Sequence, residues 1–181
     1  MTAELDTLSE FVAHVQVLHG PSATFANVVA ALKDHNVAHF ACHGRSDLTD
    51  PQESSLLLAD SDEQPFTLSA LSNLHLEQGS LAFLSACGTS EITPRLRDEA
   101  LHITSGFQLA GFRHVIGTLW PVNDRSCADI ARSVYAKLTA DGTQPVDPDQ
   151  TAYAIHDAVR RLRAETPGFP TDWAPYVHVG A

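Results

Sequence analysis

The sequence predicts an α/β sandwich with a mostly parallel central sheet. Short apolar runs alternate along the chain with longer segments whose apolar residues recur at helical spacing. The order strand, helix, strand favours parallel pairing, because parallel neighbours require a crossover between them. Four strands are expected in the sheet, near residues 14–18, 37–42, 81–86 and 114–119.

The first strand–helix–strand unit lies near the N-terminus. The run VAHVQVL at residues 12–18 is typical of a short strand. Ser22 is a suitable N-cap for a helix through residues 23–35, where apolar side chains recur at helical spacing. The strand VAHFAC at residues 37–42 completes the unit.

The middle of the chain is predicted to add further elements of both kinds. Residues 44–66 are polar around SSLLLAD, which indicates a hairpin or an edge strand, and a helix starts at Thr67. The buried strand SLAFLSAC leads into a loop over residues 88–97. Asp98 is expected to cap the next helix, which ends before Gly111 because glycine is favoured directly after a helix.

The last third combines the strand HVIGTLW, the loop PVND and two helices. The helix after PVND carries apolar residues on one side, namely Ile130, Val134, Tyr135 and Leu138. Asp147 is a suitable cap for the final helix, with Pro148 in its first turn, where a missing N–H costs little. The tail WAPYVHVGA is expected to form a closing strand.

Composition excludes several classes of function. The chain of 181 residues carries a formal charge of −11 with only 11 Lys and Arg, whereas nucleic-acid binding requires clustered basic residues. No apolar run approaches the ~18 residues of a membrane helix, and the N-terminus lacks the pattern of a secretory signal. Three cysteines without a close pair argue against a disulfide framework. We therefore expect one globular domain in the cytoplasm, without nucleic-acid or membrane partners.

Two apolar strands end on a reactive side chain followed by glycine. VAHFACHG ends in His43 and Gly44, and LAFLSACGTS contains Cys87 and Gly88. Functional groups gather at the carboxyl ends of parallel strands, so these residues and the PVND loop are expected to face one crevice. Each glycine leaves space for a substrate backbone.

This pair of strand ends predicts amide or ester hydrolysis through an acyl-enzyme. Imidazole is the usual base for a thiol nucleophile, which assigns these roles to His43 and Cys87. The backbone N–H groups of Gly44, Cys87 and Gly88 are candidate donors to the oxyanion. The spacing reveals no third residue that would orient the imidazole.

The remaining cysteines are expected to be packing residues. Strand alternation directs Cys42 away from His43, and Cys127 lies on an amphipathic helix. His39 and His43 share a strand face, but a zinc site requires three or four convergent ligands and no further pair completes the set. No metal site and no cofactor are expected.

Several motifs along the chain follow one another in a specific order: HFACHG, DPQESSLLL, LAFLSACGTS, DEALHITSGFQLAGFRHVIGTLWPVND and WAPYVHVG. In this order they resemble the CHAT family, caspase-like domains that often accompany tetratricopeptide repeats and are grouped with caspases, separases and gingipains as clan CD cysteine peptidases. The resemblance covers residues 15–180. It implies a caspase-like three-layer α/β/α sandwich, with His43 as base and Cys87 as nucleophile in the limited proteolysis of a protein partner. It also implies an activating partner or a tetratricopeptide-repeat protein.

The same resemblance affects the N-terminus. The family's usual domain begins with a strand and a helix that carry a PGA-like motif, which this sequence lacks. A fragment, a separately encoded subunit and a shortened protein whose missing edge is supplied by another chain all stay open.

Two aspartates are candidates for substrate binding. LWPVND resembles the separase segment that begins Leu-Trp-Asp and ends in an aspartate of the substrate pocket. Carried over, Asp124 lies near the pocket for the residue before the scissile bond and favours Arg or Lys there, and Asp47 is a further candidate of the same kind. Alternatively, Asp124 caps the helix starting at Arg125.

Two other functions stay open. One is a non-catalytic caspase-like module that acts by binding, against which the intact His43 and Cys87 argue. The other is a stand-alone esterase or amidase that acts on small molecules.

Overall fold

The computed structural model describes residues 2–45, 47, 49–85 and 96–180. They fall into two compact units. The larger comprises residues 16–121 and 179–181, and the smaller comprises residues 1–15 and 122–178.

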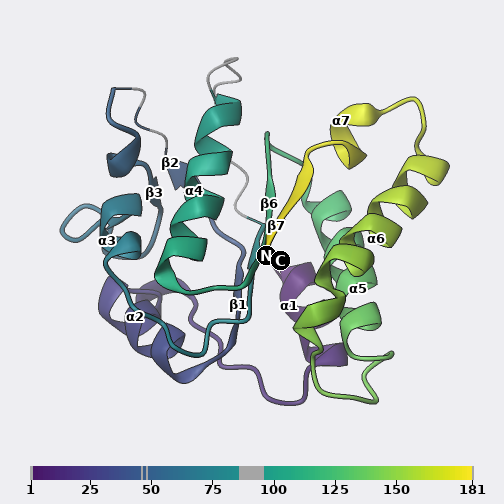
Figure 1. Cartoon of the computed structure of the whole chain (residues 1–181), viewed down its shortest axis with the longest axis horizontal. Helices are drawn as coiled ribbons and strands as arrows, with labels where there is room; N and C mark the ends of the chain where they lie inside the picture. Colours follow the sequence, from purple (N-terminus) through teal and green to yellow (C-terminus); the bar gives the residue numbers. More distant parts are fainter. Residues whose placement is uncertain (1, 46, 48, 86–95, 181) are drawn as a thin grey trace. The chain divides into compact units, whose positions relative to one another are not determined.

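A four-stranded sheet with the order β1-β5-β6-β7 organises the fold (Figure 1). Its strands are β1 (Val37–Phe40), β5 (Leu81–Leu84), β6 (His114–Thr118) and β7 (Tyr176–Gly180). β5 pairs in parallel with both β1 and β6. All four residues of β5 are buried, as expected for a parallel strand covered on both faces. The predicted α/β class with a mostly parallel sheet is confirmed, and the arrangement is consistent with a caspase-like fold.

The core of the larger unit lies between one face of the sheet and its helices. The helices are α2 (Phe25–Asp34), α3 (Leu68–Ser72) and α4 (Leu96–Ala110). Phe40 of β1 packs edge-on against Phe107 of α4, with ring centroids 5.1 Å apart, and Phe25 packs edge-on against Phe66 at 5.7 Å. Each buried side chain of this size contributes about 1.5–3 kcal/mol to folding. The aromatic contacts therefore bind helices and strands that are distant in sequence.

A second, antiparallel sheet of short strands follows β1. It comprises β2 (Gly44–Arg45), β3 (Ser55–Leu56) and β4 (Phe66–Thr67), in that order, with the 3₁₀ turn η2 (Pro51–Glu53) before β3. The predicted hairpin or edge strand in residues 44–66 is thereby confirmed. The side chain of Thr67 accepts a hydrogen bond from the N–H of Ala70 and caps α3, as expected.

The smaller unit is helical. It contains α1 (Thr2–Phe11), α5 (Asp124–Leu138), the 3₁₀ turn η3 (Pro148–Gln150), α6 (Thr151–Glu165) and α7 (Pro170–Trp173). The predicted apolar side of α5 is buried. Arg132 of α5 pairs with Glu10, hydrogen-bonds Thr7 at 3.4 Å and lies over the ring of Phe11. This arginine therefore binds α1 to α5.

The predicted strand at residues 12–18 is wrong. Residues 12–19 form neither helix nor strand, and the sequence did not predict the helix α1 that ends at Phe11. A strand exists only through hydrogen bonds to a neighbour, and no described strand pairs with this segment. Residues 12–18 have the apolar alternation of a strand, but no described strand lies beside them to pair with.

Helix starts were predicted less well than helix ends. Thr24 rather than Ser22 caps α2, through a bond from the N–H of Asn27. Asp98 is not a cap, because α4 already begins at Leu96. Gly111 follows α4 with φ of 121°, as expected of the residue after a helix. Asp147 does not cap α6 as expected, because its carboxylate accepts from the N–H of Asp149 at the start of η3 and the cap of α6 is Gln150.

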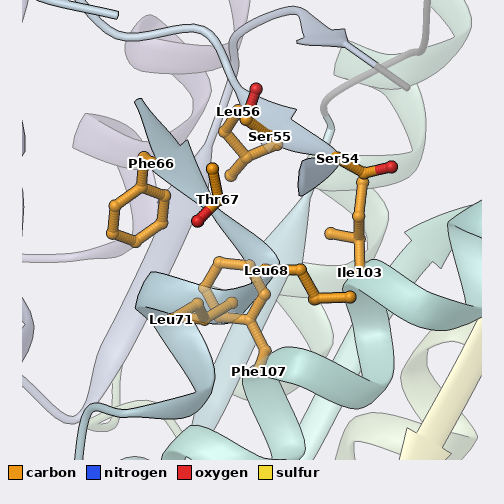
Figure 2. Close-up of a pocket in the computed structure, with 9 residues that line it drawn as sticks. All are labelled: Ser54, Ser55, Leu56, Phe66, Thr67, Leu68, Leu71, Ile103 and Phe107. Atoms are coloured by element: carbon orange, nitrogen blue, oxygen red, sulfur yellow. The ribbon is translucent and has the colours of Figure 1, made fainter. Parts of the chain in front are cut away.

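A small pocket lies between the short sheet, α3 and α4 (Figure 2). Its lining residues are Ser54, Ser55, Leu56, Phe66, Thr67, Leu68, Leu71, Ile103 and Phe107. The two serines differ in their bonding. The hydroxyl of Ser54 accepts a hydrogen bond from the N–H of Asp47 at 3.0 Å, whereas the buried hydroxyl of Ser55 has no hydrogen-bond partner among the described residues.

The two adjacent serines should therefore respond in opposite directions to replacement by alanine. Ser55→Ala removes a buried hydroxyl that makes no bond and should raise the free energy of unfolding by about 1 kcal/mol. Ser54→Ala deprives the N–H of Asp47 of its acceptor and should lower that free energy by about 1 kcal/mol. Urea unfolding of both variants measures the difference, and equal destabilisation would contradict the assignment.

Candidate active site

His43 lies between the two sheets of the larger unit. It follows β1 by three residues and immediately precedes β2. Its side chain is exposed, and its backbone carbonyl accepts a hydrogen bond from the N–H of Leu57 at 2.8 Å. The backbone of His43 is therefore held between β1 and β2. Its imidazole is accessible to a substrate.

The register of the short sheet determines the direction of the Gly44 amide. Gly44 lies opposite Leu56 on β3, and the bond from Leu57 to the carbonyl of His43 flanks that pair. This pattern makes Gly44 and Leu56 a non-hydrogen-bonded pair, in which the N–H points away from the neighbouring strand. Since β2 is at the edge of its sheet, the N–H of Gly44 points away from β3, and Gly44 itself is buried next to the exposed His43.

The fold itself does not require glycine at position 44. A Cβ built there would meet only the carbonyl oxygen of Ser55, at an ordinary contact distance of 3.7 Å. Gly44 is itself buried, so this contact lies inside the fold.

Cys87 and Gly88 lie outside the described residues. The structure does describe the strand that leads to them. β5 ends at Leu84, and the N–H of Ser85 continues the ladder by donating to the carbonyl of Phe40 at 2.9 Å.

The other two cysteines are packing residues, as predicted. Cys42 is half-buried and packs against the core of the larger unit, whereas the neighbouring His43 is exposed. Cys127 is buried on α5, with its sulfur 3.8 Å from the hydroxyl of Tyr176.

Asp47 organises the loop that follows β2. One oxygen of its carboxylate accepts hydrogen bonds from the Thr49 hydroxyl at 2.7 Å and from the N–H groups of Thr49 and Asp50 at 2.8 and 3.0 Å. The Thr49 hydroxyl, followed by the two backbone donors, lowers the pKa of Asp47 from 3.8 to about 2. A role for Asp47 in substrate binding stays a prediction, and the contacts show a role in loop structure.

Asp124 is the first residue of α5, in the smaller unit. It is not the cap of that helix, so the alternative interpretation is wrong. Asn123 is the cap, and its side-chain oxygen accepts from the N–H of Ser126 at 2.9 Å. The amide nitrogen of Asn123 donates to Asp172 of α7 at 3.4 Å, which orients the amide. The exposed carboxylate of Asp124 is therefore not used in capping.

The asparagine was visible in the sequence as a potential cap. Asn and Asp are about equally good N-caps, so the dipeptide Asn123-Asp124 leaves the choice to backbone geometry. No sequence signal points to the contact with Asp172, because the two residues are distant in sequence.

The described part of the chain has neither a cluster of metal-ligating side chains nor a membrane-spanning helix. Among those residues no group of three or more His, Cys, Asp or Glu is arranged to hold a metal ion. None of the described helices is both long and apolar enough to cross a bilayer.

A family model described as the CHAT domain matches residues 1–181. The chain belongs to the CHAT family. CHAT domains are a caspase-like peptidase family, in agreement with the α/β fold and with a histidine after the strand next to β5. No curated protein matches this CHAT domain.

The low pKa of Asp47 can be tested through its neighbour Thr49. In Thr49→Val the hydroxyl donor is lost, so the pKa of Asp47 should rise from about 2 toward 3.8. Thr49→Ser keeps the hydroxyl and serves as the control. The carboxylate's contribution to stability is fully present above pH 3.8 and is lost as the pH falls through about 2. The carboxyl ¹³C shift of Asp47 followed against pH gives the pKa, and identical titrations in the three proteins would contradict the expectation.

Proposed function

We propose that this CHAT domain is a cysteine endopeptidase that cleaves a protein substrate, with His43 as base and Cys87 as nucleophile. The supporting observation is the register between the two strands that lead to these residues. Phe40 of β1 lies opposite Leu84 of β5, and the strands are parallel neighbours. His43 follows Phe40 by three residues, and Cys87 follows Leu84 by three residues. Both residues thus lie three positions beyond a pair of opposite residues, at the same edge of the sheet. This placement favours proximity of the imidazole and the thiol.

Each step of the reaction is assigned to a group of the chain. His43 removes the proton from the Cys87 thiol, and the thiolate attacks the carbonyl carbon of the scissile bond. The negative charge develops on the carbonyl oxygen, which accepts hydrogen bonds from backbone N–H groups. His43 then donates its proton to the leaving amine, and water hydrolyses the thioester to release the acid and the free thiol.

The direction of the Gly44 N–H supports its role as an oxyanion donor. The non-hydrogen-bonded pairing with Leu56 turns this N–H away from β3, so it is not used within the short sheet. A single donor of this kind is worth about 10²–10³ in rate. The N–H groups of Cys87 and Gly88 are proposed as further donors.

The nucleophile assignment can be tested with an acyloxymethyl ketone that carries a basic residue. Intact-mass spectrometry should detect one covalent adduct on the full chain and none on Cys87→Ala. His43→Ala should slow adduct formation by about 10²-fold or more, because the thiol loses its base. Cys42→Ala is the matched control and should react like the wild type, because Cys42 packs in the core. An adduct that persists in Cys87→Ala would contradict the assignment. Repeating the reactions with and without a candidate activating partner would extend the test to an enzyme that needs activation.

We further propose that Asp124 favours Arg or Lys before the scissile bond. Its carboxylate is exposed at the first position of α5, and Asn123 performs the capping. A negative charge that the helix start does not use for capping is suited to binding a basic side chain.

Substitutions at the two adjacent positions should separate specificity from stability. Asp124→Asn should abolish any preference for Arg or Lys in a peptide-library cleavage profile while changing the free energy of unfolding by only about 0.5 kcal/mol. Asn123→Ala should lower that free energy by about 1 kcal/mol because the cap is lost. A profile that is the same in the wild type and in Asp124→Asn would refute the role of Asp124.

A further inference from the structure

The segment between α1 and the 3₁₀ turn η1 (Gly20–Ser22) has the composition of a strand without being one. Residues 14–17 are all exposed, including Val15 and Val17, whose exposed fractions are 38% and 47%. In an extended chain these valines point to one side, and Leu18 points to the other. Leu18 packs against the core of the larger unit. The segment is therefore anchored at one end and exposes two β-branched side chains to water.

Among the described strands, none pairs with the outer side of β1. β1 is the first strand in the order and pairs with β5 on one side. The carbonyls of Asn36 and Phe40 accept from the N–H groups of Leu81 and Ser85 at 3.2 and 2.9 Å. Because backbone direction alternates along a strand, the N–H and C=O of Val37 point to the opposite, outer side.

Neither element carries the charges that usually protect an exposed edge. Residues 11–32 and 35–44 contain no Asp, Glu, Lys or Arg, in a chain with 33 such residues and a formal charge of −11. Edge strands of soluble proteins are commonly protected by charged side chains or proline, and these are missing both from β1 and from residues 13–19. The charged surface elsewhere opposes approach of a second copy, whereas this region does not.

We propose that two copies of the chain associate reciprocally, with residues 13–18 of each copy adding as a strand to the outer edge of β1 of the other. The chain itself supplies both complementary parts, which is the condition for a two-fold interface. Main-chain bonds to Val37 and burial of Val15 and Val17 provide the affinity. The association is independent of the proposed peptidase activity.

The oligomeric state of the full chain is the first test. Sedimentation velocity between about 1 and 200 µM should show a reversible monomer–dimer equilibrium. Amide hydrogen exchange at Val37 should slow as the concentration rises, because the outer N–H becomes bonded in the dimer. The proposal would be overturned by a chain that is monomeric over the whole range, or by an exchange rate at the Val37 amide that does not depend on protein concentration.

Two pairs of variants locate the interface. Val15→Lys with Val17→Lys should raise the dimer dissociation constant about tenfold or more, because two charges would be buried against a strand. The control, Leu109→Lys with Tyr153→Lys, makes the same charge change at exposed apolar residues of α4 and α6 and should leave the constant unchanged. Val37→Pro removes the outer N–H without touching the bonds to β5 and should weaken the dimer similarly, whereas Val37→Ala should not. Equal effects of the lysine pairs would overturn the proposal.

Discussion

The parallel pairing of β1 with β5 is the constraint on which the rest of this structure depends. β5 is buried along its whole length, so its backbone groups must be satisfied by neighbouring strands, and its side chains define the core. The register that places Phe40 opposite Leu84 brings Phe40 into contact with Phe107 of α4. The same register gives the two strands a common end, from which the candidate catalytic residues continue.

The short antiparallel sheet extends this constraint beyond the end of β1. The N–H of Leu57 fixes the carbonyl of His43, and the N–H of Asp47 is bonded to Ser54, so the chain on both sides of β2 is held against the region of β3. The loop after β2 is stabilised further by the three bonds to the Asp47 carboxylate. The exposed imidazole of His43 and the N–H of Gly44, which points away from β3, are thus neighbours on a backbone held by hydrogen bonds.

Some features of the fold and site could be predicted from local chemistry. The buried strand and the apolar side of α5 follow from the runs and spacing of apolar residues, and the glycine after α4 follows from its own backbone freedom. The strand at residues 12–18 was predicted from its alternation and was wrong, because alternation describes a side-chain pattern and a strand requires a partner. The cap at Asn123 rather than Asp124 depended on which residue has extended backbone geometry.

By itself, the sequence determined the α/β class and the CHAT family, because these depend on apolar runs and on the order of motifs. Tertiary structure decided the strand register, the direction of the Gly44 amide away from β3 and the structural use of the Asp47 carboxylate. These features depend on hydrogen bonds between residues from different segments. Their geometry is fixed only when the segments pack together, so it cannot be predicted from a local sequence pattern.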